Sequence, residues 1–402
     1  MNKVVPGLGA LLLSTSLANA GALDRTGQPV TALFAEGTTA ELSFGFTSPD
    51  VQGTHTNRLS GAATDSGNVG VDFTQVTLSF KTDLNDRLSV AVILDQPFGA
   101  DVEYGDAGLG YPIGGSRAEF ESSGLTALAR YRFNDAFSLH GGARLVRVDA
   151  DLLINTLIPV GPTGVPVGPG EIPTGASLFS YDAEFDTDSD VGFVLGAAYE
   201  RPDIALRVAL TYSSETEFTH DTTFARTFGG AAIPGATSGT TTYTLPQSVN
   251  LEFQTGIAAD TLLFGSIRWA DWSETEISVP GYALGATDFN PVVSYEGDYV
   301  TYTLGVGRRF SDRLSASAAV IYEPGVFSDF DPTDPRIGAS NLAPTDGQLG
   351  IQLAASYAVT DNLELGGGIR YTRLGDASTR RIGAEFEDND ALSLGLRAAY
   401  RF

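Results

Sequence analysis

The sequence predicts an all-β fold: a transmembrane antiparallel β-barrel of about 14 strands with a short N-terminal plug segment. Three observations predict it. A turn pattern recurs six times, the first 20 residues have the form of an export signal, and the last strand alternates in polarity up to a terminal aromatic residue.

The six turns each join two runs in which apolar and polar residues alternate. Each contains Asn, Asp, Ser or Pro, which stop a strand because their side chains or fixed φ stabilise tight turns. The turns lie at 82–88, 133–137, 199–204, 258–262, 310–314 and 359–363. Six short turns imply six hairpins closed on the same side of one sheet, as in an up-and-down barrel.

The N-terminus predicts a cleavable signal peptide over residues 1–20. Lys3 supplies a positive charge, Val4 to Leu13 form a short apolar stretch, and Ala18-Asn19-Ala20 forms a small-residue cleavage site. A membrane anchor would need a longer apolar span. Later segments contain no long uninterrupted apolar run, which excludes helical membrane spans.

The strands predicted around the turns form a barrel over residues 39–402, preceded by a plug segment at 21–38. A first strand lies near Thr39 to Thr47, and the hairpins run roughly over 72–98, 118–149, 188–213, 247–272, 299–323 and 347–373. In the terminal strand, Leu392, Leu394, Leu396, Ala398, Tyr400 and Phe402 share one face, because strand side chains alternate between faces. The segments opposite the turns are long, and short turns facing long loops are typical of outer-membrane barrels.

A soluble β-sandwich or edge strand could also alternate in polarity. The residues near the turns are regularly aromatic, however, which favours a lipid-interface girdle over a sandwich. These are Tyr131, Phe133, Tyr199, Phe310, Tyr357, Tyr400 and Phe402.

The chain is acidic, with 24 Lys and Arg against 49 Asp and Glu and a net charge of −25. A nucleic-acid partner is therefore excluded, since nothing would neutralise phosphates. Acidic residues concentrate opposite the turns, for example at 182–190 and 329–334. They are interpreted either as solvating charges of exposed loops or as divalent-ion contacts with lipopolysaccharide, because hard cations take carboxylate oxygens. The absence of Cys excludes disulfides.

Catalysis finds little support in the sequence. His55, His140 and His220 are the only histidines, and none has nucleophile or metal-ligand spacing. Gly-x-Ser-x-Gly and phosphate-binding Gly loops are absent. We expect no enzyme activity, no metal and no cofactor.

Three stretches, in their order and spacing, resemble the FadL/TodX family of outer-membrane transporters for long-chain fatty acids and other hydrophobic compounds. They are 95–101 (DQPFGAD), 245–249 with 264–272 (LPQSV, FGSIRWADW) and 302–310 (YTLGVGRRF). The resemblance covers the mature chain and implies a barrel occluded by an N-terminal hatch, with a break in the third strand that opens toward lipid. It also implies an outer-membrane location.

The predicted break lies at Gln96, Pro97 and Gly99. Pro97 lacks a ladder donor and Gly99 lacks a side chain, so the third strand cannot pair regularly there. The alternative is that the strand merely ends at the outer surface. The Asn-Pro-Ala hatch motif of better-known members is absent and only residues 21–38 precede the first strand, so a smaller or differently seated plug is expected.

An apolar loop is predicted after the fifth strand and could form an outer groove that captures an alkyl chain, since each buried CH2 is worth about 0.8 kcal/mol. The alternative is a self-packed loop that caps the barrel. The candidate groove residues are Leu152, Leu153, Ile154, Leu157, Ile158, Val160 and, further on, Ile172, with Phe224 and Phe228 as a second wall.

A substrate carboxylate would need cationic partners in the lumen, and Arg can bind it through two hydrogen bonds. By strand phase, Arg144, Arg207, Arg268, Arg370 and Arg397 point inward, as do Glu252 and Glu364. Internal Arg–Glu pairs that stabilise the barrel are the alternative.

The sequence thus favours a passive, substrate-selective channel. A general diffusion porin for small hydrophilic solutes is the second interpretation, and a surface adhesin or structural barrel the third. Expected partners are a long-chain fatty acid or other hydrophobic molecule, outer-membrane lipid and lipopolysaccharide. Phe402 resembles the terminal tag read by the barrel-assembly machinery, and we expect a monomer.

Overall fold

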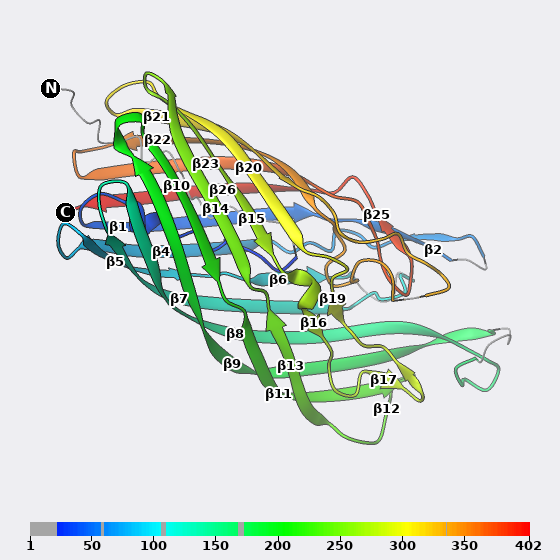
Figure 1. Cartoon of the computed structure of the whole chain (residues 1–402). Helices are drawn as coiled ribbons and strands as arrows, with labels where there is room; N and C mark the ends of the chain where they lie inside the picture. Colours follow the sequence, from blue (N-terminus) through cyan, green and yellow to red (C-terminus); the bar gives the residue numbers. More distant parts are fainter. Residues whose placement is uncertain (1–21, 58–59, 106–109, 168–172, 335) are drawn as a thin grey trace.

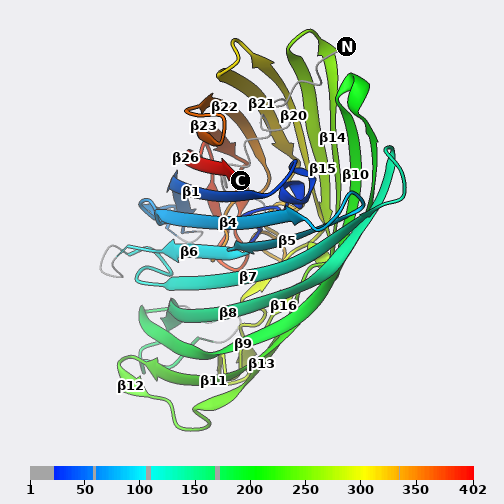
Figure 2. The ribbon, with the colours of Figure 1, turned by 90° about the vertical axis from the view of Figure 1, so that its left-hand side faces the viewer.

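A computed structural model describes residues 22–57, 60–105, 110–167, 173–334 and 336–402. The predicted signal peptide and Ile172 lie outside these residues. The described chain forms one closed antiparallel barrel, whose strands run obliquely around a common axis (Figures 1 and 2). The fold prediction is confirmed.

Fourteen strands build the wall in the described part of the chain, and three of them are made of two pieces: β5 with β6, β10 with β11, and β13 with β14. The barrel closes because β1 pairs with both β4 and β26. The wall strands are β1 Thr39–Asp50, β4 Phe73–Asp83, β5 Leu88–Asp95, β6 Gly99–Glu103, β7 Arg117–Arg132, β8 Phe137–Val160, β9 Gly175–Arg201, β10 Leu206–Ser213, β11 Thr216–Phe228, β13 Ser238–Leu245, β14 Ser248–Ala258, β15 Thr261–Ala270, β20 Tyr299–Arg309, β21 Leu314–Glu323, β22 Gln348–Ala358, β23 Leu363–Leu374 and β26 Asp390–Arg401.

The six predicted turns all join consecutive wall strands, and their side chains hold them closed. Asn85 Oδ1 accepts hydrogen bonds from the backbone N–H groups of Arg87 (2.9 Å) and Leu88 (3.0 Å). Asn134 does the same one hairpin later. Asp260 adopts the left-handed region at φ 56°, which Asp tolerates better than most residues. Local side-chain chemistry therefore sets these turns.

A band of apolar side chains faces outward around the barrel. Val92, Leu210, Ile351 and Leu396 are between 42% and 64% exposed, which a protein surrounded by water would not repeat on every strand. Among the described residues, no helix is long and apolar enough to cross a membrane. Aromatic residues near the turns are also exposed, including Tyr131, Phe133, Phe310, Tyr400 and Phe402.

The prediction of a loop at residues 152–160 is wrong, because β8 continues through them. β8 stays paired with β9 as far as Val160 opposite Gly175. Figure 2 shows β7, β8 and β9 side by side in one curved wall, and in Figure 1 β8 and β9 extend beyond the ends of β15 and β20. Above the lipid-facing band, the outward side chains of β7 and β8 include acidic ones, such as Glu121 and Asp151, while inward ones such as Phe120 and Leu152 are apolar. β8 and β9 therefore continue as paired strands beyond the lipid-facing band.

The pairing of β9 is interrupted where it passes from β10 to β11. Backbone pairing stops at Val194 opposite Ser213 and resumes at Phe185 opposite Thr222. In between, the carboxylates of Asp188 and Asp190 accept hydrogen bonds from the backbone N–H groups of Thr219 (2.7 Å) and Glu217 (2.9 Å). Two of the acidic residues at 182–190 therefore replace ladder bonds.

Shorter elements cover the end of the barrel opposite the turns (Figure 1). One group is a small sheet in the order β24-β25-β2-β3, and another is the segment 271–298 between β15 and β20. These elements are β2 Gly53–Thr56, β3 Ala63–Asp65, β12 Ala231–Ala232, β16 Glu276–Ile277, β17 Ala283–Leu284, β18 Thr287–Asp288, β19 Val293–Ser294, β24 Ala377–Ser378 and β25 Ala384–Phe386, with the 3₁₀ helix η5 Trp272–Glu274. Two other 3₁₀ helices lie elsewhere: η2 Thr31–Phe34 in the N-terminal segment and η4 Pro202–Ile204 in the turn between β9 and β10.

Candidate functional site: the plugged lumen and the wall opening

The third wall strand is broken between Asp95 and Gly99. Residues 78–83 of β4 pair with β5, but residues 73–77 pair with β1 and not with β5 or β6. β6 pairs with β7 one register position away from β5, so this strand carries one extra residue. The predicted residues Gln96, Pro97 and Gly99 lie in this break. The wall opening is the gap between residues 73–77 of β4 and 99–101 of β6, and it ends where Gly70 bridges to Val102.

A cavity of about 590 Å³ occupies the wall opening. Its lining combines inward residues, such as Phe98 and Phe120, with outward residues, such as Glu119 and Glu121. Since strand neighbours point to opposite faces, a cavity lined by both sets passes through the wall. Gln96 crosses the lower edge of this cavity, where its Oε1 accepts a hydrogen bond from the N–H of Val76 (3.0 Å).

The N-terminal segment, residues 22–38, completes the broken strand from inside the barrel. The N–H of Arg25 donates to the carbonyl of Pro97 (2.9 Å), and the N–H of Gly99 donates to the carbonyl of Leu23 (2.9 Å). A Cβ at Gly99 would lie 2.6 Å from the Arg25 Nε, so a larger residue there must displace the Arg25 side chain. The wall opening and the N-terminal segment therefore form one hydrogen-bonded unit.

Ion pairs and side-chain hydrogen bonds fix the same segment to opposite sides of the lumen. The Arg268 Nε donates a hydrogen bond to the Asp24 carboxylate (2.7 Å), and the Arg268 Nη2 lies 2.6 Å from the same oxygen as an ion pair, with both side chains below 10% exposure. Arg25 pairs with Asp101 on β6 (2.6 Å). Gln28 accepts a hydrogen bond from Arg144 on β8. Charged hydrogen bonds of this kind are stronger than neutral ones.

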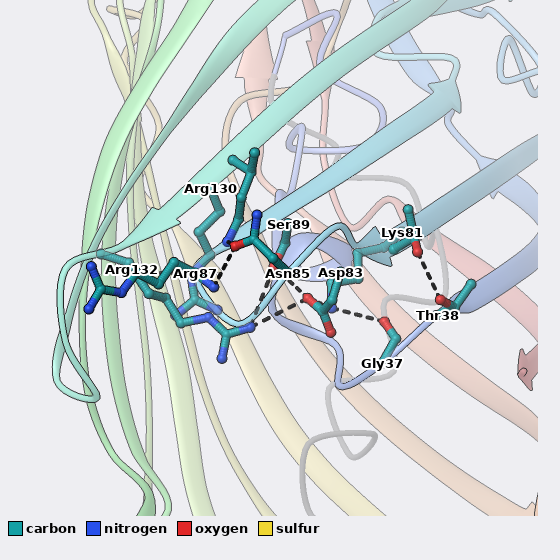
Figure 3. A network of polar contacts seen from close by, with 12 residues as sticks. Gly37, Thr38, Lys81, Asp83, Asn85, Arg87, Ser89, Arg130 and Arg132 are labelled. Carbon is teal, nitrogen blue, oxygen red and sulfur yellow. Dashed lines mark hydrogen bonds and ion pairs between the residues drawn. The ribbon is translucent and has the colours of Figure 1, made fainter.

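The lower end of the N-terminal segment is anchored to β4 by a buried lysine (Figure 3). The Lys81 ammonium donates to the carbonyl of Gly37 (2.9 Å) and to the Asp83 carboxylate (2.6 Å). Asp83 also accepts from Ser89 (2.5 Å) and from Arg132 (3.4 Å), which ties the anchor to β5 and β7. A lysine so buried requires such partners.

Between its two anchors, the segment packs into an apolar patch of the barrel interior. Val30, which precedes η2, and Leu33 of η2 are almost fully buried against a group of wall residues, Ala91, Ile93, Leu128 and Val194. The guanidinium groups of Arg130 and Arg207 lie over the Phe34 ring in a cation–π arrangement, with their Cζ atoms 4.6 and 4.8 Å from the ring centroid.

All five arginines predicted to face the lumen do so: Arg144, Arg207, Arg268 and Arg370 are buried, and Arg397 is half-buried in the lining. Three of them, Arg144, Arg207 and Arg268, contact the N-terminal segment as described. Arg397 pairs with Glu41 on β1 (2.6 Å) and Glu364 on β23 (2.8 Å), and Arg370 donates to Gln352 (2.9 Å). Glu252, also predicted to face inward, interacts electrostatically with Arg207. The alternation of side chains along each strand therefore predicted that these arginines face the lumen, but it did not predict their partners in the N-terminal segment.

Below the N-terminal segment, the lumen opens as a vestibule of about 1750 Å³ toward the turns. Its lining is rich in charged residues, among them Arg130, Arg207, Arg370 and Glu364, and it reaches up to Arg268 and Thr26. Such a space solvates ions and polar groups well and alkyl groups poorly.

Above the N-terminal segment, the lumen is filled by a continuous apolar cluster, here called the aromatic column. It runs from Leu23, Phe98 and Phe120 at the wall opening to Phe179, Tyr181 and Tyr282 under the outer segments. Rings in contact connect it, including Phe98 with Trp272 (6.0 Å) and Tyr181 with Tyr282 (5.1 Å). Its buried members also include Phe218, Phe224, Tyr243, Trp272, Tyr295 and Tyr299.

The predicted groove residues divide between this column and the surface. Leu152, Ile154 and Phe224 are buried members of the column, and Ile158 and Phe228 pack against it. Val160 is buried at the end of β8. Leu153 and Leu157 are half-buried, and Leu153 lies opposite the exposed residues Arg117 and Asp182 in register.

The phenols of the column remain protonated at any physiological pH. Burial raises the pKa of Tyr282 to about 12 and that of Tyr295 further. Burial also lowers the pKa of Arg380 to about 10, next to the segment that contains Tyr295. The column itself is thus apolar and uncharged.

Within the described ranges, no group of His, Asp and Glu side chains is placed to hold a metal ion. His140 bonds to Thr211 (2.9 Å) and His220 to the carbonyl of Asp186 (2.6 Å) and to Tyr243 (2.8 Å). These two imidazoles therefore have structural partners.

Sequence reasoning missed Asp24, Arg25 and Lys81 as site residues. Lys81 pairs with Asp83 two positions away, but the partners that join these three residues to distant parts of the chain lie 44 to 244 positions away, so no local pattern marks them as site residues. The one available signal is that charged residues at 24 and 25 stand in a segment predicted to enter a lumen, where a charge needs a partner.

A family model described as outer membrane protein transport protein (OMPP1/FadL/TodX) matches residues 29–341. A FadL homologue from Pseudomonas aeruginosa has a TM-score of 0.72 to this structure at 16% identity, covering 97% of this chain and 98% of that chain. The toluene transporter TodX of P. putida has a TM-score of 0.66 at 15% identity, covering 96% and 99%. The toluene transporter TbuX of Ralstonia pickettii has a TM-score of 0.62 at 14% identity, covering 99% of each chain. These three structures share the fold. No curated protein matches the chain by sequence.

Proposed function

The chain belongs to the OMPP1/FadL/TodX family of outer-membrane transport proteins, and on that premise we propose that it takes up long-chain fatty acids or other hydrophobic compounds by passive diffusion. Substrate enters at the outer end of the aromatic column. It leaves sideways through the wall opening into the membrane.

One observation carries this proposal: the aromatic column ends at the wall opening. Phe98 and Phe120 are members of the column and also line the cavity that passes through the wall. An apolar molecule that displaces column side chains can therefore reach the lipid without contact with the vestibule.

The vestibule would be a costly alternative path. A chain of about ten CH2 groups loses about 8 kcal/mol on moving from apolar surroundings into water, at about 0.8 kcal/mol per CH2. Lateral exit avoids this loss because the molecule passes from the column to lipid acyl chains. The N-terminal segment, which seals the column from the vestibule with ion pairs, supports the same route.

The alternative function is a general diffusion porin for small hydrophilic solutes. A porin needs a continuous polar path, whereas here the aromatic column and the N-terminal segment stand between the outer end and the vestibule. The charged vestibule is the part of the lumen that would suit a porin, and bilayer conductance tests this alternative.

We assign the buried arginines to the resting structure instead of to a substrate carboxylate. A carboxylate would have to displace Asp24 from Arg268, Gln28 from Arg144, or two glutamates from Arg397. We also propose that the exposed Phe402 is read by the barrel-assembly machinery and that the protein acts as a monomer in contact with lipopolysaccharide.

The test joins the two sides of the wall opening. Since the chain contains no Cys, Thr74→Cys and Val102→Cys, which both line the cavity, can be linked selectively by a short bis-maleimide. Linked protein in liposomes should lose uptake of a hydrophobic probe. Ser356→Cys with Gly366→Cys, opposite each other in β22 and β23, is the matched control and should keep full uptake.

Retained uptake in the linked wall-opening variant would contradict lateral exit. Mass spectrometry of small molecules retained by the purified protein, paired with bilayer conductance, separates the two functions. Large steady ion conductance without bound hydrophobic molecules would establish the porin instead.

A further inference from the structure

The cavity in the wall opening is strongly acidic at its outer rim. Two cations, Arg25 and Arg117, also line it, and Arg25 is already paired with Asp101. The carboxylates that line it are Asp72, Asp101, Glu103, Glu119, Glu121 and Asp151.

Several of these carboxylates form a row across neighbouring strands. Asp101 on β6 lies directly opposite Glu119 on β7, and Glu119 lies opposite Asp151 on β8. The row continues to Glu184 on β9. Like charges directly opposite each other destabilise a sheet, so the row weakens the wall it belongs to.

The row faces outward, just above the lipid-facing band. Along β7, Leu125 is exposed and residues 123, 121 and 119 follow on the same face, while Ser122 and Phe120 are buried inside. A molecule that leaves the aromatic column for the membrane must therefore pass these carboxylates.

The six carboxylates that line this path outnumber its two cations, Arg25 and Arg117, so an anion meets a net negative lining. Arg25 is held by Asp101 and Arg268 by Asp24, both within 3 Å. Arg144 donates to Gln28 and to Thr126 (2.9 Å). An entering carboxylate would be repelled by the six carboxylates of the lining, with only Arg25, already paired with Asp101, and Arg117 there to offset them. A neutral molecule experiences no such repulsion.

We propose that the acidic rim makes the wall opening a charge filter, which passes neutral hydrophobic compounds and disfavours amphiphiles that carry a carboxylate. This inference rests on the proposed lateral route and narrows its substrate class to uncharged aromatic or aliphatic molecules. Asp101, Glu119, Glu121 and Asp151 are the specificity-determining residues.

The experiment compares two probes with the same alkyl chain, dodecanoate and methyl dodecanoate, in liposomes that contain the intact protein. The native protein should take up the ester about tenfold faster than the acid anion at low salt, a difference equivalent to about 1.4 kcal/mol. In the triple variant Glu119→Gln, Glu121→Gln, Asp151→Asn, uptake of the anion should rise to within about twofold of the ester.

The matched control removes three outward carboxylates that do not line the cavity: Glu215→Gln, Glu217→Gln and Asp221→Asn. It changes the net charge equally and should leave the ratio of the two rates unchanged. Salt provides a test without substitution, because the Debye length shortens from about 30 Å at 0.01 M to about 3 Å at 1 M. High salt should raise anion uptake by the native protein and leave ester uptake constant.

Equal uptake of anion and ester by the native protein at low salt would overturn the filter and leave the transport function intact. An unchanged ratio in the triple variant and at high salt would overturn it as well. Failure to take up either probe would instead contradict the proposed function.

Discussion

The Asp24–Arg268 pair provides the sharpest test of how the N-terminal segment closes the lumen. We predict that Asp24→Ala releases the segment. The substitution leaves the Arg268 guanidinium buried with Asn250 (2.9 Å) as its remaining hydrogen-bond partner in the described structure. Once the segment moves away, Arg268 is hydrated from the vestibule that it lines. The penalty therefore falls on the closed state.

Removal of one partner of a buried ion pair costs about 3–5 kcal/mol. At 1.4 kcal/mol per factor of ten, the ratio of closed to open molecules should fall by about 100- to 3000-fold. The assay is single-channel recording in planar bilayers, where the fraction of time spent in conducting states should rise accordingly. Asp334→Asn breaks the exposed loop pair with Arg336 (2.8 Å) and serves as the control, since exposed pairs contribute at most about 1 kcal/mol.

The double variant Asp24→Leu with Arg268→Met removes the ion pair without leaving a buried charge unpaired. It therefore separates the effect of losing the pair from the effect of the unpaired Arg268. Replacement of both ions by apolar side chains of similar volume is often neutral, so the double variant should conduct less than Asp24→Ala. An open fraction in Asp24→Ala within about threefold of the native value would refute the reasoning, because even the lower estimate of the lost energy requires a far larger change.

Three further predictions follow from contacts described above. Gly99→Leu should fill the cavity in the wall opening and reduce uptake of bulky hydrophobic probes at least tenfold, with normal barrel assembly on electrophoresis; unaltered uptake would contradict lateral exit. Arg397→Met leaves the carboxylates of Glu41 and Glu364 without their shared cation and should lower the free energy of unfolding by about 3 kcal/mol in denaturant titrations, an effect that a substrate-binding arginine at an otherwise stable position would not show. Tyr282→Ala removes a buried ring from the aromatic column at a local cost of about 3–5 kcal/mol, so limited proteolysis should cut the segment 271–298 faster than in the native protein, and equal rates would count against its role in packing.

The barrel was predictable because its signals are local. Asn85 and Asn134 hold their turns through bonds to residues two and three positions away. The alternation of Leu392 through Phe402 needs no knowledge of the rest of the fold. Inward arginines follow from the same alternation, which is why their positions were found.

The outer part of β8 was predicted as a loop because its outward side chains are charged instead of apolar. Its side chains nevertheless continue to alternate between the two faces of the strand. Beyond Leu145, the outward residues of β8 are Arg147, Asp149 and Asp151 instead of apolar ones. A strand length matched to the bilayer therefore ended the predicted strand too early. Alternation of Asp151 with the inward residues Leu152 and Ile154 was the usable signal, since it marks a strand with water outside and a core inside.

The wall opening is a joint property of the third strand and the N-terminal segment. In an unbroken barrel, the carbonyl of Pro97 and the N–H of Gly99 would bond to a neighbouring wall strand; here they bond to Arg25 and Leu23. Each buried backbone group left unpaired would cost about 1–3 kcal/mol. The segment therefore cannot withdraw unless β6 finds new partners, and the nearest unpaired strand edge in the described wall is that of β4 at residues 73–77. If the N-terminal segment withdraws and β6 bonds to β4 instead, the lumen opens toward the vestibule and the wall opening narrows in the same step. The protein therefore cannot have an open path to the vestibule and a wide wall opening at the same time.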